Sequence, residues 1–280
     1  MKDLKLIVFA NYPDKILDPV TQTIPYPLVP VTQETPLLKH AVDIWRAAFD
    51  IPERRTYVVV RHDAVMDYVV YATYWQPIRT HVTYPAPALD TIGQLKPPYL
   101  IVSCEYLFSR SFLEKIREKK ITEACKSPVT FIDVAEMEVK DNHFEAMVVT
   151  EPLRPTTFGD ESLCLRYHVQ RAVDCDSPAS IRIDAREGKD FLVLDSPYRI
   201  PPACVSGICL SVGAAVLWHG KTYQVLYPPC RDAWMSVLFA YRDTCYETHH
   251  YRKDLFQWPT PDEVREEQDL ARNIVEDVWR

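Results

Sequence analysis

The chain has 280 residues, of which 47% are hydrophobic and 25% charged, and its formal net charge is −7 at pH 7. This length and composition suit one large globular domain and exclude a low-complexity or disordered chain. The acidic balance argues against a nucleic-acid partner, because binding to phosphate backbones depends on clustered Lys and Arg side chains.

The apolar runs and the cysteines predict a cytoplasmic protein with no membrane partner. The longest apolar run, 203–218, is shorter than the ~20 residues of a membrane span, and the one near the start is too short for a signal peptide. The 8 cysteines include no CxxC pair, so we expect reduced thiols and neither a zinc site nor disulfides. Cys245, His249 and His250 have a loose ligand-like spacing, but no second pair accompanies them.

The first part of the chain predicts strands that alternate with helices. The run 4–10, which is apolar except for Lys5, is typical of a strand buried on both faces. The proline-rich stretch 19–36 predicts an extended loop, because each proline removes an N–H and restricts the residue before it. A helix starting at Leu37 and a β-branched strand over 56–60 complete a strand-loop-helix-strand unit.

The same alternation continues more loosely up to about residue 126. It predicts, in chain order, a helix over 64–74, strands over 80–84 and 99–103, and a helix over 109–119. Strands and helices in this order indicate a mostly parallel sheet with helices on both faces.

The second part of the chain is expected to be more antiparallel. Strand-like runs occur at 129–134, 144–150, 191–194 and 222–226, without long helices between them. Helices are predicted over 232–241 and 261–279, and Thr260 caps the last one in a Thr-x-x-Glu capping box. No linker or repeat divides the chain, so we expect one α/β domain over 1–280: a Rossmann-like mixed sheet flanked by helices.

One segment carries a resemblance to a known family. Residues 10–31 read ANYPDKILDPVTQTIPYPLVPV, which resembles the sugar-phosphate nucleotidyltransferase signature AGGxGTRLxPLTxxxPKPLxPV without a gap. Matching residues are Ala10, Leu17, Pro19, Thr21, Pro25, Pro27, Leu28, Pro30 and Val31. Two later segments agree in order: 98–108 resembles the family's PFLVVNGDxLF, and 256–263 resembles its WxDIGTPED.

This resemblance implies a nucleotide-diphospho-sugar transferase-like fold with two halves. Residues 1–126 would be the nucleotide-binding-like half, and 127–280 the sugar-binding-like half with the C-terminal helix. In this family a sugar phosphate attacks the α-phosphate of a nucleoside triphosphate, and a glycine loop, cations and Mg²⁺ stabilise the charge.

The loop and the cations that this chemistry needs are mostly missing here. Asn11, Tyr12 and Asp14 stand where the family has loop glycines, so side chains fill the space in which backbone N–H groups would approach a triphosphate. The loop arginine aligns with Ile16 and the lysine of the PKP motif with Tyr26. Lys15 is the one nearby candidate to replace a cation.

The metal site and the base-contacting segment also depart from the family pattern. Glu105 stands where the first Mg²⁺ aspartate is expected and stays a weak metal candidate, whereas the second aspartate becomes Gln257, a neutral ligand. The Gly-Thr segment that contacts the base would lie near 85–87, and the lysine of a later EKP motif near 151–152 is missing.

Several functions remain open. The leading hypothesis is a catalytically degenerate relative that acts as a regulatory, scaffolding or ligand-binding partner of another protein or of an active paralogue. Its cleft, with candidate residues Asn11, Tyr12, Asp14, Lys15, Tyr26 and Cys104, could still hold a sugar or a nucleotide.

Two enzymes and a structural role are the alternatives. The first enzyme is a divergent nucleotidyltransferase that uses Lys15, Glu105 and Mg²⁺. The second is a nucleotide-sugar-dependent glycosyltransferase with Asp174-Cys175-Asp176 as a metal-binding DxD motif, although an exposed turn explains that triplet more simply. A structural protein that adopted an old enzyme fold is the third possibility, because fold does not fix function.

Overall fold

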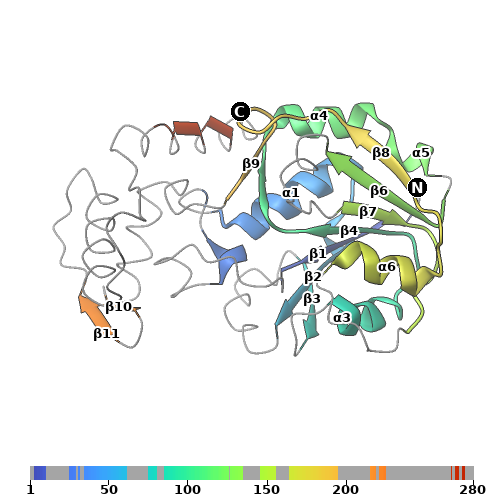
Figure 1. Ribbon diagram of the computed structural model, residues 1–280, viewed down its shortest axis with the longest axis horizontal. Helices are drawn as coiled ribbons and strands as arrows, with labels where there is room; N and C mark the ends of the chain where they lie inside the picture. Colours follow the sequence, from blue (N-terminus) through green and yellow to red (C-terminus); the bar gives the residue numbers. More distant parts are fainter. Residues whose placement is uncertain are drawn as a thin grey trace, which may run out of the picture.

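The architecture is a mixed, mostly parallel sheet covered by helices on both faces (Figure 1). A computed structural model of the chain describes residues 3–10, 25–29, 31, 35–61, 75–80, 85–125, 127–134, 146–155, 164–194, 215–218, 221–224, 266, 269–270 and 273–274. Its 7-stranded sheet consists, from edge to edge, of β3 (Gln76–Thr80), β2 (Thr56–Arg61), β1 (Lys5–Phe9), β4 (Tyr99–Ser103), β7 (Ala146–Val149), β6 (Val129–Val134) and β8 (Ala179–Ile183).

Only β7 runs against the other strands of this sheet. It pairs antiparallel with β4 and with β6, whereas the β1–β2, β1–β4, β2–β3 and β6–β8 pairs are parallel. Two short antiparallel pairs lie outside the large sheet: β5 (Tyr106–Phe108) with β9 (Phe191–Val193), and β10 (Ala215–Trp218) with β11 (Lys221–Gln224). The expected mixed sheet with more antiparallel pairing later in the chain is therefore confirmed.

Each face of the sheet carries its own apolar cluster. The helices α1 (Leu37–Phe49) and α4 (Arg110–Glu118) cover one face, and α3 (Pro85–Ile92) and α6 (Leu165–Val173) cover the other (Figure 1). The short helix α5 (Ile121–Ala124) and the 3₁₀ turns η2 (Tyr26–Leu28) and η3 (Glu53–Arg55) complete the described elements. The central strands β1 and β4 are buried almost throughout, which explains their continuous apolar sequences.

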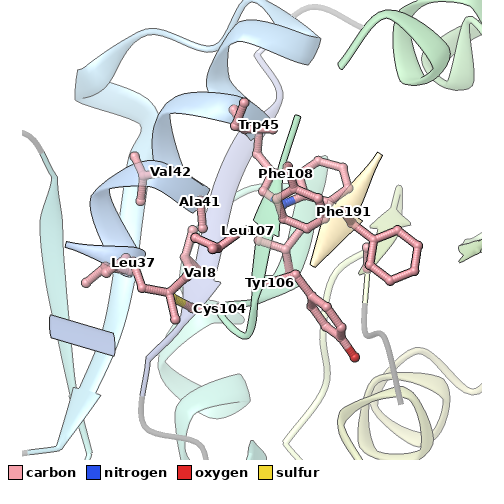
Figure 2. Close-up of a cluster of buried hydrophobic side chains, with 14 of the residues drawn as sticks. Val8, Leu37, Ala41, Val42, Trp45, Cys104, Tyr106, Leu107, Phe108 and Phe191 are labelled. Atoms are coloured by element: carbon pink, nitrogen blue, oxygen red, sulfur yellow. The ribbon is translucent and has the colours of Figure 1, made fainter. Parts of the chain in front are cut away.

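Aromatic rings fill the space between α1, α4 and β5. The Trp45 ring packs edge-on against Phe108 and Phe112, which stack on each other with centroids 4.5 Å apart. Figure 2 shows Phe108 beside Phe191 of β9, with Trp45 of α1 nearby. Ser109 caps α4, because its hydroxyl accepts a hydrogen bond of 3.3 Å from the Phe112 amide. The β5–β9 pair is thus fixed to the main core.

The structure corrects two of the expected elements. The strand expected over 80–84 begins earlier, because β3 covers Gln76–Thr80, and residues 81–84 fall outside the described residues. Pro77 lies inside it, and the sheet accepts a proline there because β3 is an edge strand. The stretch 19–36 was expected to be extended, but η2 makes a 3₁₀ turn with a proline in its first turn, where the missing N–H costs nothing.

Several expected elements fall partly or wholly outside the described residues. The helices over 64–74 and 232–241 and the Thr260 cap belong to this group, whereas residues 266, 269–270 and 273–274 are helical. Ile274 is 3% exposed and packs in the cluster of the α1 and α4 face. No helix among the described residues has the length and hydropathy that a membrane span requires.

Gly93 at the end of α3 is a position that cannot accept a larger residue. A Cβ atom there would lie 2.7 Å from the Leu153 carbonyl oxygen and 3.3 Å from that of Leu89. We expect Gly93→Ala to lower the free energy of unfolding by about 1–3 kcal/mol, because the backbone around Leu153 must shift. Urea unfolding measures this loss, and Thr91→Ala at an exposed position of the same segment serves as the control. Equal stability of the two variants would contradict the prediction.

Candidate functional site

The carboxyl ends of the parallel strands meet at one edge of the sheet. β1 lies between β2 and β4: the chain adds β2 and β3 on one side of β1 and then adds β4 on the other side. In open α/β sheets ligands bind at such a switch point, beyond the carboxyl ends of the strands. This places the candidate site next to Ala10, Arg61 and Ser103, which end or directly follow β1, β2 and β4.

The loop candidates follow β1 directly in the sequence. Asn11, Tyr12, Asp14 and Lys15 all fall outside the described residues, as does Gln257. Their roles therefore stay predictions that rest on the sequence.

Cys104 links β4 to β5 and lies in the core. The residue is 2% exposed and belongs to the apolar cluster with Val8 and Leu37, and Figure 2 shows its sulfur among these side chains. Burial, and then the negative charge of Glu105, raise the pKa of the Cys104 thiol far above its ordinary value. The thiol consequently stays protonated at neutral pH and is a poor nucleophile or metal ligand.

Glu105 is the acidic residue at the switch point. It follows Cys104 directly and is 8% exposed. A Mg²⁺ site needs several oxygen ligands around one point. Among the described residues no group of three His, Cys, Asp or Glu side chains comes together in a way that could hold a metal ion. The described residues therefore do not by themselves fit a magnesium site.

Tyr26 lies next to the same junction and makes structural contacts there. Its hydroxyl lies 2.8 Å from the carbonyl oxygen of Leu194, to which it donates, and 3.2 Å from that of Glu105. The residue is 5% exposed. The side chain at the position of the family's PKP lysine is thus uncharged, buried and bound to backbone atoms of two segments that are distant in the sequence.

Loss of this hydroxyl should destabilise the fold. We expect Tyr26→Phe to lower the free energy of unfolding by about 1–2 kcal/mol, because two buried carbonyl groups lose a donor. Tyr167→Phe is the matched control, since the Tyr167 hydroxyl receives a hydrogen bond from Arg171 at an exposed position. A larger loss in the control than in Tyr26→Phe, measured by chemical unfolding, would disprove the role assigned to Tyr26.

The DxD candidate lies at the opposite edge of the sheet. Asp174 ends α6 in the left-handed conformation with φ 60°, and the triplet 174–176 precedes the amino end of β8. β8 runs in the same direction as β4, because both β4 and β6 are antiparallel to β7 and β8 is parallel to β6. The triplet comes before the amino end of β8, whereas Glu105 follows the carboxyl end of β4. The two therefore lie at opposite ends of the strands. Cys245, His249 and His250 fall outside the described residues.

Two strand-end residues were not anticipated from the sequence. Arg61 is the last residue of β2 and is half-buried, and Ser103 is the last residue of β4 and is 1% exposed. Arg61 lies outside the motifs, and Ser103 lies in the segment 98–108 but was not singled out there. The signal that could have found both is their position at the polar end of an apolar strand.

Comparisons with known proteins give similarities of fold alone. No protein-family model and no curated protein matches the chain. The solved structures similar to it include inositol-1-phosphate CTP transferase from T. maritima, with 15% identity, 73% of this chain and 96% of that chain covered, and a TM-score of 0.49. CTP:phosphocholine cytidylyltransferase from Streptococcus pneumoniae shares 12% identity with a TM-score of 0.42, and the match covers 69% of this chain and 94% of that chain.

A third similar structure is described as mannose-1-phosphate geranyltransferase from Thermus thermophilus. It shares 20% identity with a TM-score of 0.40, and the match covers 47% of this chain and 41% of that protein. The chain thus spans less than half the length of this relative. Each of these three structures is named as a transferase.

Proposed function

We propose that this protein is a nucleotidyltransferase-like domain that has lost its catalytic parts and acts as a non-catalytic regulatory or scaffolding partner of another protein. The observation that carries the proposal is that Tyr26, an uncharged and buried residue, stands where the motif has a lysine. A lysine at this position would supply a positive charge to phosphate oxygens, but the tyrosine hydroxyl binds the Leu194 and Glu105 carbonyl groups and supports the fold.

The size of the expected catalytic loss supports the same proposal. Removing one preorganised charge partner commonly costs ~10²–10³ in rate. In this sequence both motif cations are replaced, by Ile16 and Tyr26, and the loop glycines are replaced by bulky or acidic residues. Losses at several of these positions would leave little activity above the uncatalysed reaction.

A divergent active nucleotidyltransferase is the second candidate. Glu105 favours it, because this residue keeps a carboxylate at the switch point where the family has a metal-binding aspartate. In that case Lys15 would supply the missing positive charge, and magnesium would polarise the phosphate oxygens when bound.

Calorimetric titration with the four common nucleoside triphosphates and Mg²⁺ distinguishes the two candidates. We expect no heat of binding at micromolar concentrations, no pyrophosphate release in a coupled assay, and a second protein that co-purifies with the tagged chain at a fixed ratio. Turnover that Glu105→Gln abolishes and the exposed control Glu123→Gln preserves would establish the enzyme instead. A chain that purifies alone would remove the main support for the partner role.

A further inference from the structure

We propose that this chain forms a homodimer in which β8, an outer strand of the large sheet, pairs antiparallel with β8 of a second copy. The inference goes beyond the proposed function, because it concerns how the chain assembles with itself. It rests on the open edge of the sheet, on the exposure of alternate β8 side chains and on the charges around Asp133.

The two outer strands of the sheet differ in how they are protected against further pairing. β3, at one edge, carries Pro77, which has no N–H group to donate to another strand. β8, at the other edge, contains no proline and no lysine, the residues that commonly block an open edge, and its one charged residue is Arg182. No described strand lies beyond β8 (Figure 1). This edge of the sheet is therefore the one that accepts a further strand.

Alternate side chains of β8 face different surroundings. Ile181 packs against the apolar cluster of the α1 and α4 face but is only half-buried. Ser180 and Arg182 are exposed and lie on the opposite face, because side chains alternate along a strand. There the Ser180 hydroxyl donates to the Asp133 carboxylate, which also accepts a hydrogen bond of 2.6 Å from Arg166. The strand thus presents an incompletely covered isoleucine on one face and a fixed carboxylate near a guanidinium on the other.

Two-fold symmetry and the sequence of β8 select one register for this pair. A two-fold axis perpendicular to the sheet keeps its faces, so only residues of the same face lie opposite each other. With Ile181 opposite its own copy, all 5 residues of β8 pair, and Arg182 lies opposite Ser180 of the second copy. A shift by two residues either places Arg182 opposite Arg182 or brings Pro178 into the ladder. The register centred on Ile181 avoids both.

The charges around the pair suit this register. In each copy Ser180 is bound to Asp133, so Arg182 of the other copy comes opposite a serine that lies beside a carboxylate. Opposite charges on neighbouring strands stabilise a sheet, and a long side chain reaches diagonal neighbours about 7–8 Å away. The symmetry forms this contact twice, and the two Ile181 side chains lose exposed apolar surface at the same time. Two short strands make a small interface, so we expect a reversible dimer whose formation depends on concentration.

Sedimentation velocity of the purified full-length chain over a range of concentrations tests the dimer. We expect a reversible monomer–dimer equilibrium. Ser180→Glu, which places a carboxylate opposite Arg182, should tighten it about threefold to thirtyfold, and Ser180→Lys should weaken it by a similar factor, because each substitution changes two cross-strand pairs at once. Adding Arg182→Glu to Ser180→Lys should restore the dimer, because the two charges then face each other with their signs exchanged.

Arg79→Glu is the matched control, because it changes the charge of an exposed arginine on β3 at the other edge of the sheet and should leave the equilibrium unchanged. Urea unfolding of dilute protein separates folding from assembly. Ser180→Glu should unfold more easily than Ser180→Lys, because a second carboxylate beside Asp133 repels it, and this order is opposite to that of the dimer affinities.

Two results would overturn the homodimer. One is a chain that stays monomeric at its highest soluble concentration, and the other is a shift of the equilibrium in the same direction by Ser180→Glu and Ser180→Lys. Neither result decides the proposed function, because the purified chain is measured alone here, whereas co-purification of a second protein tests that function.

Discussion

Asp190→Asn is expected to lower the free energy of unfolding by about 2–4 kcal/mol, one of the two largest effects we predict. The Asp190 side chain is 0% exposed and accepts hydrogen bonds from Lys115 Nζ at 2.7 Å, from the Arg186 amide at 2.8 Å and from the Ser111 hydroxyl. Asparagine would lose the ion pair and turn an NH₂ group toward one of three donors. Breaking a buried, hydrogen-bonded pair from one side is strongly destabilising.

The pH dependence of this effect follows from the same contacts. Burial acts to raise the pKa of Asp190, but the hydrogen bonds from Lys115, Ser111 and the Arg186 amide hold it below the ordinary value of 3.8. A carboxyl with a lowered pKa stabilises the fold at pH values above its unfolded pKa, and this contribution disappears as the pH falls through the folded pKa. The difference in stability between wild type and Asp190→Asn should therefore shrink below about pH 4.

Urea unfolding at several pH values measures both effects. Asp184→Asn is the matched control, because Asp184 is an exposed aspartate close to Asp190 in the sequence. A loss below about 0.5 kcal/mol in Asp190→Asn, the usual range of surface substitutions, would show that the turn before β9 does not depend on this carboxylate.

The second large effect is a loss of about 3 kcal/mol of stability between pH 6.5 and pH 4 that originates in His40. Burial lowers the pKa of His40 from 6.5 to about 4, only partly opposed by its hydrogen bond to Phe108. Its Nε2 atom in α1 lies 3.0 Å from the Phe108 amide and 3.1 Å from the Phe108 carbonyl oxygen. One pKa unit corresponds to about 1.4 kcal/mol of differential stability.

The sign of this effect is fixed by linkage. Above pH 6.5 the imidazole is neutral in both the folded and the unfolded chain, so the fold has its full stability. Between pH 6.5 and pH 4 the unfolded chain takes up the proton and the folded chain does not, and stability therefore falls as the pH falls. Below about pH 4 both forms are protonated and this contribution levels off.

His40→Gln should flatten the slope of stability against pH over this range, because an amide does not titrate. Chemical unfolding of both chains at half-unit pH intervals gives the comparison, and NMR of the folded wild type should show no titration of the His40 ring between pH 7 and pH 5. The same slope in both chains would assign the pH dependence to other groups.

The central strands could be predicted from the sequence, because a strand that is buried on both faces has apolar residues at most successive positions. The runs at 4–10, 56–60, 99–103 and 129–134 are mostly apolar, and the structure has β1, β2, β4 and β6 there. The helix α3 was not anticipated, because Pro85 and Pro87 resemble a loop, although prolines are acceptable in the first turn of a helix. The edge strand β8 was missed because its sequence, ASIRI, is short and half polar.

The functional site itself stays a prediction, and the structure bears only on one proximity within it. The resemblance placed Tyr26 and Cys104 in one cleft, and the Tyr26 hydroxyl lies 3.2 Å from the carbonyl oxygen of Glu105, the residue after Cys104. The partner at Leu194 could not be foreseen, because it lies 168 residues along the chain from Tyr26 and no local pattern encodes such a contact. The roles of Asn11, Tyr12, Asp14 and Lys15 stay predictions.

The interleaving of strands in the large sheet has a consequence for how the polypeptide reaches its native state. β4 pairs with β7, and β5 pairs with β9, so the paired residues are more than forty positions apart in the sequence and are synthesised at different times. A ribosome that has released only the first 126 residues exposes the edge of β4 without its antiparallel neighbour. Nascent chains of that length would be vulnerable to edge-to-edge association, and cotranslational protection of β4 would matter more than its local propensity.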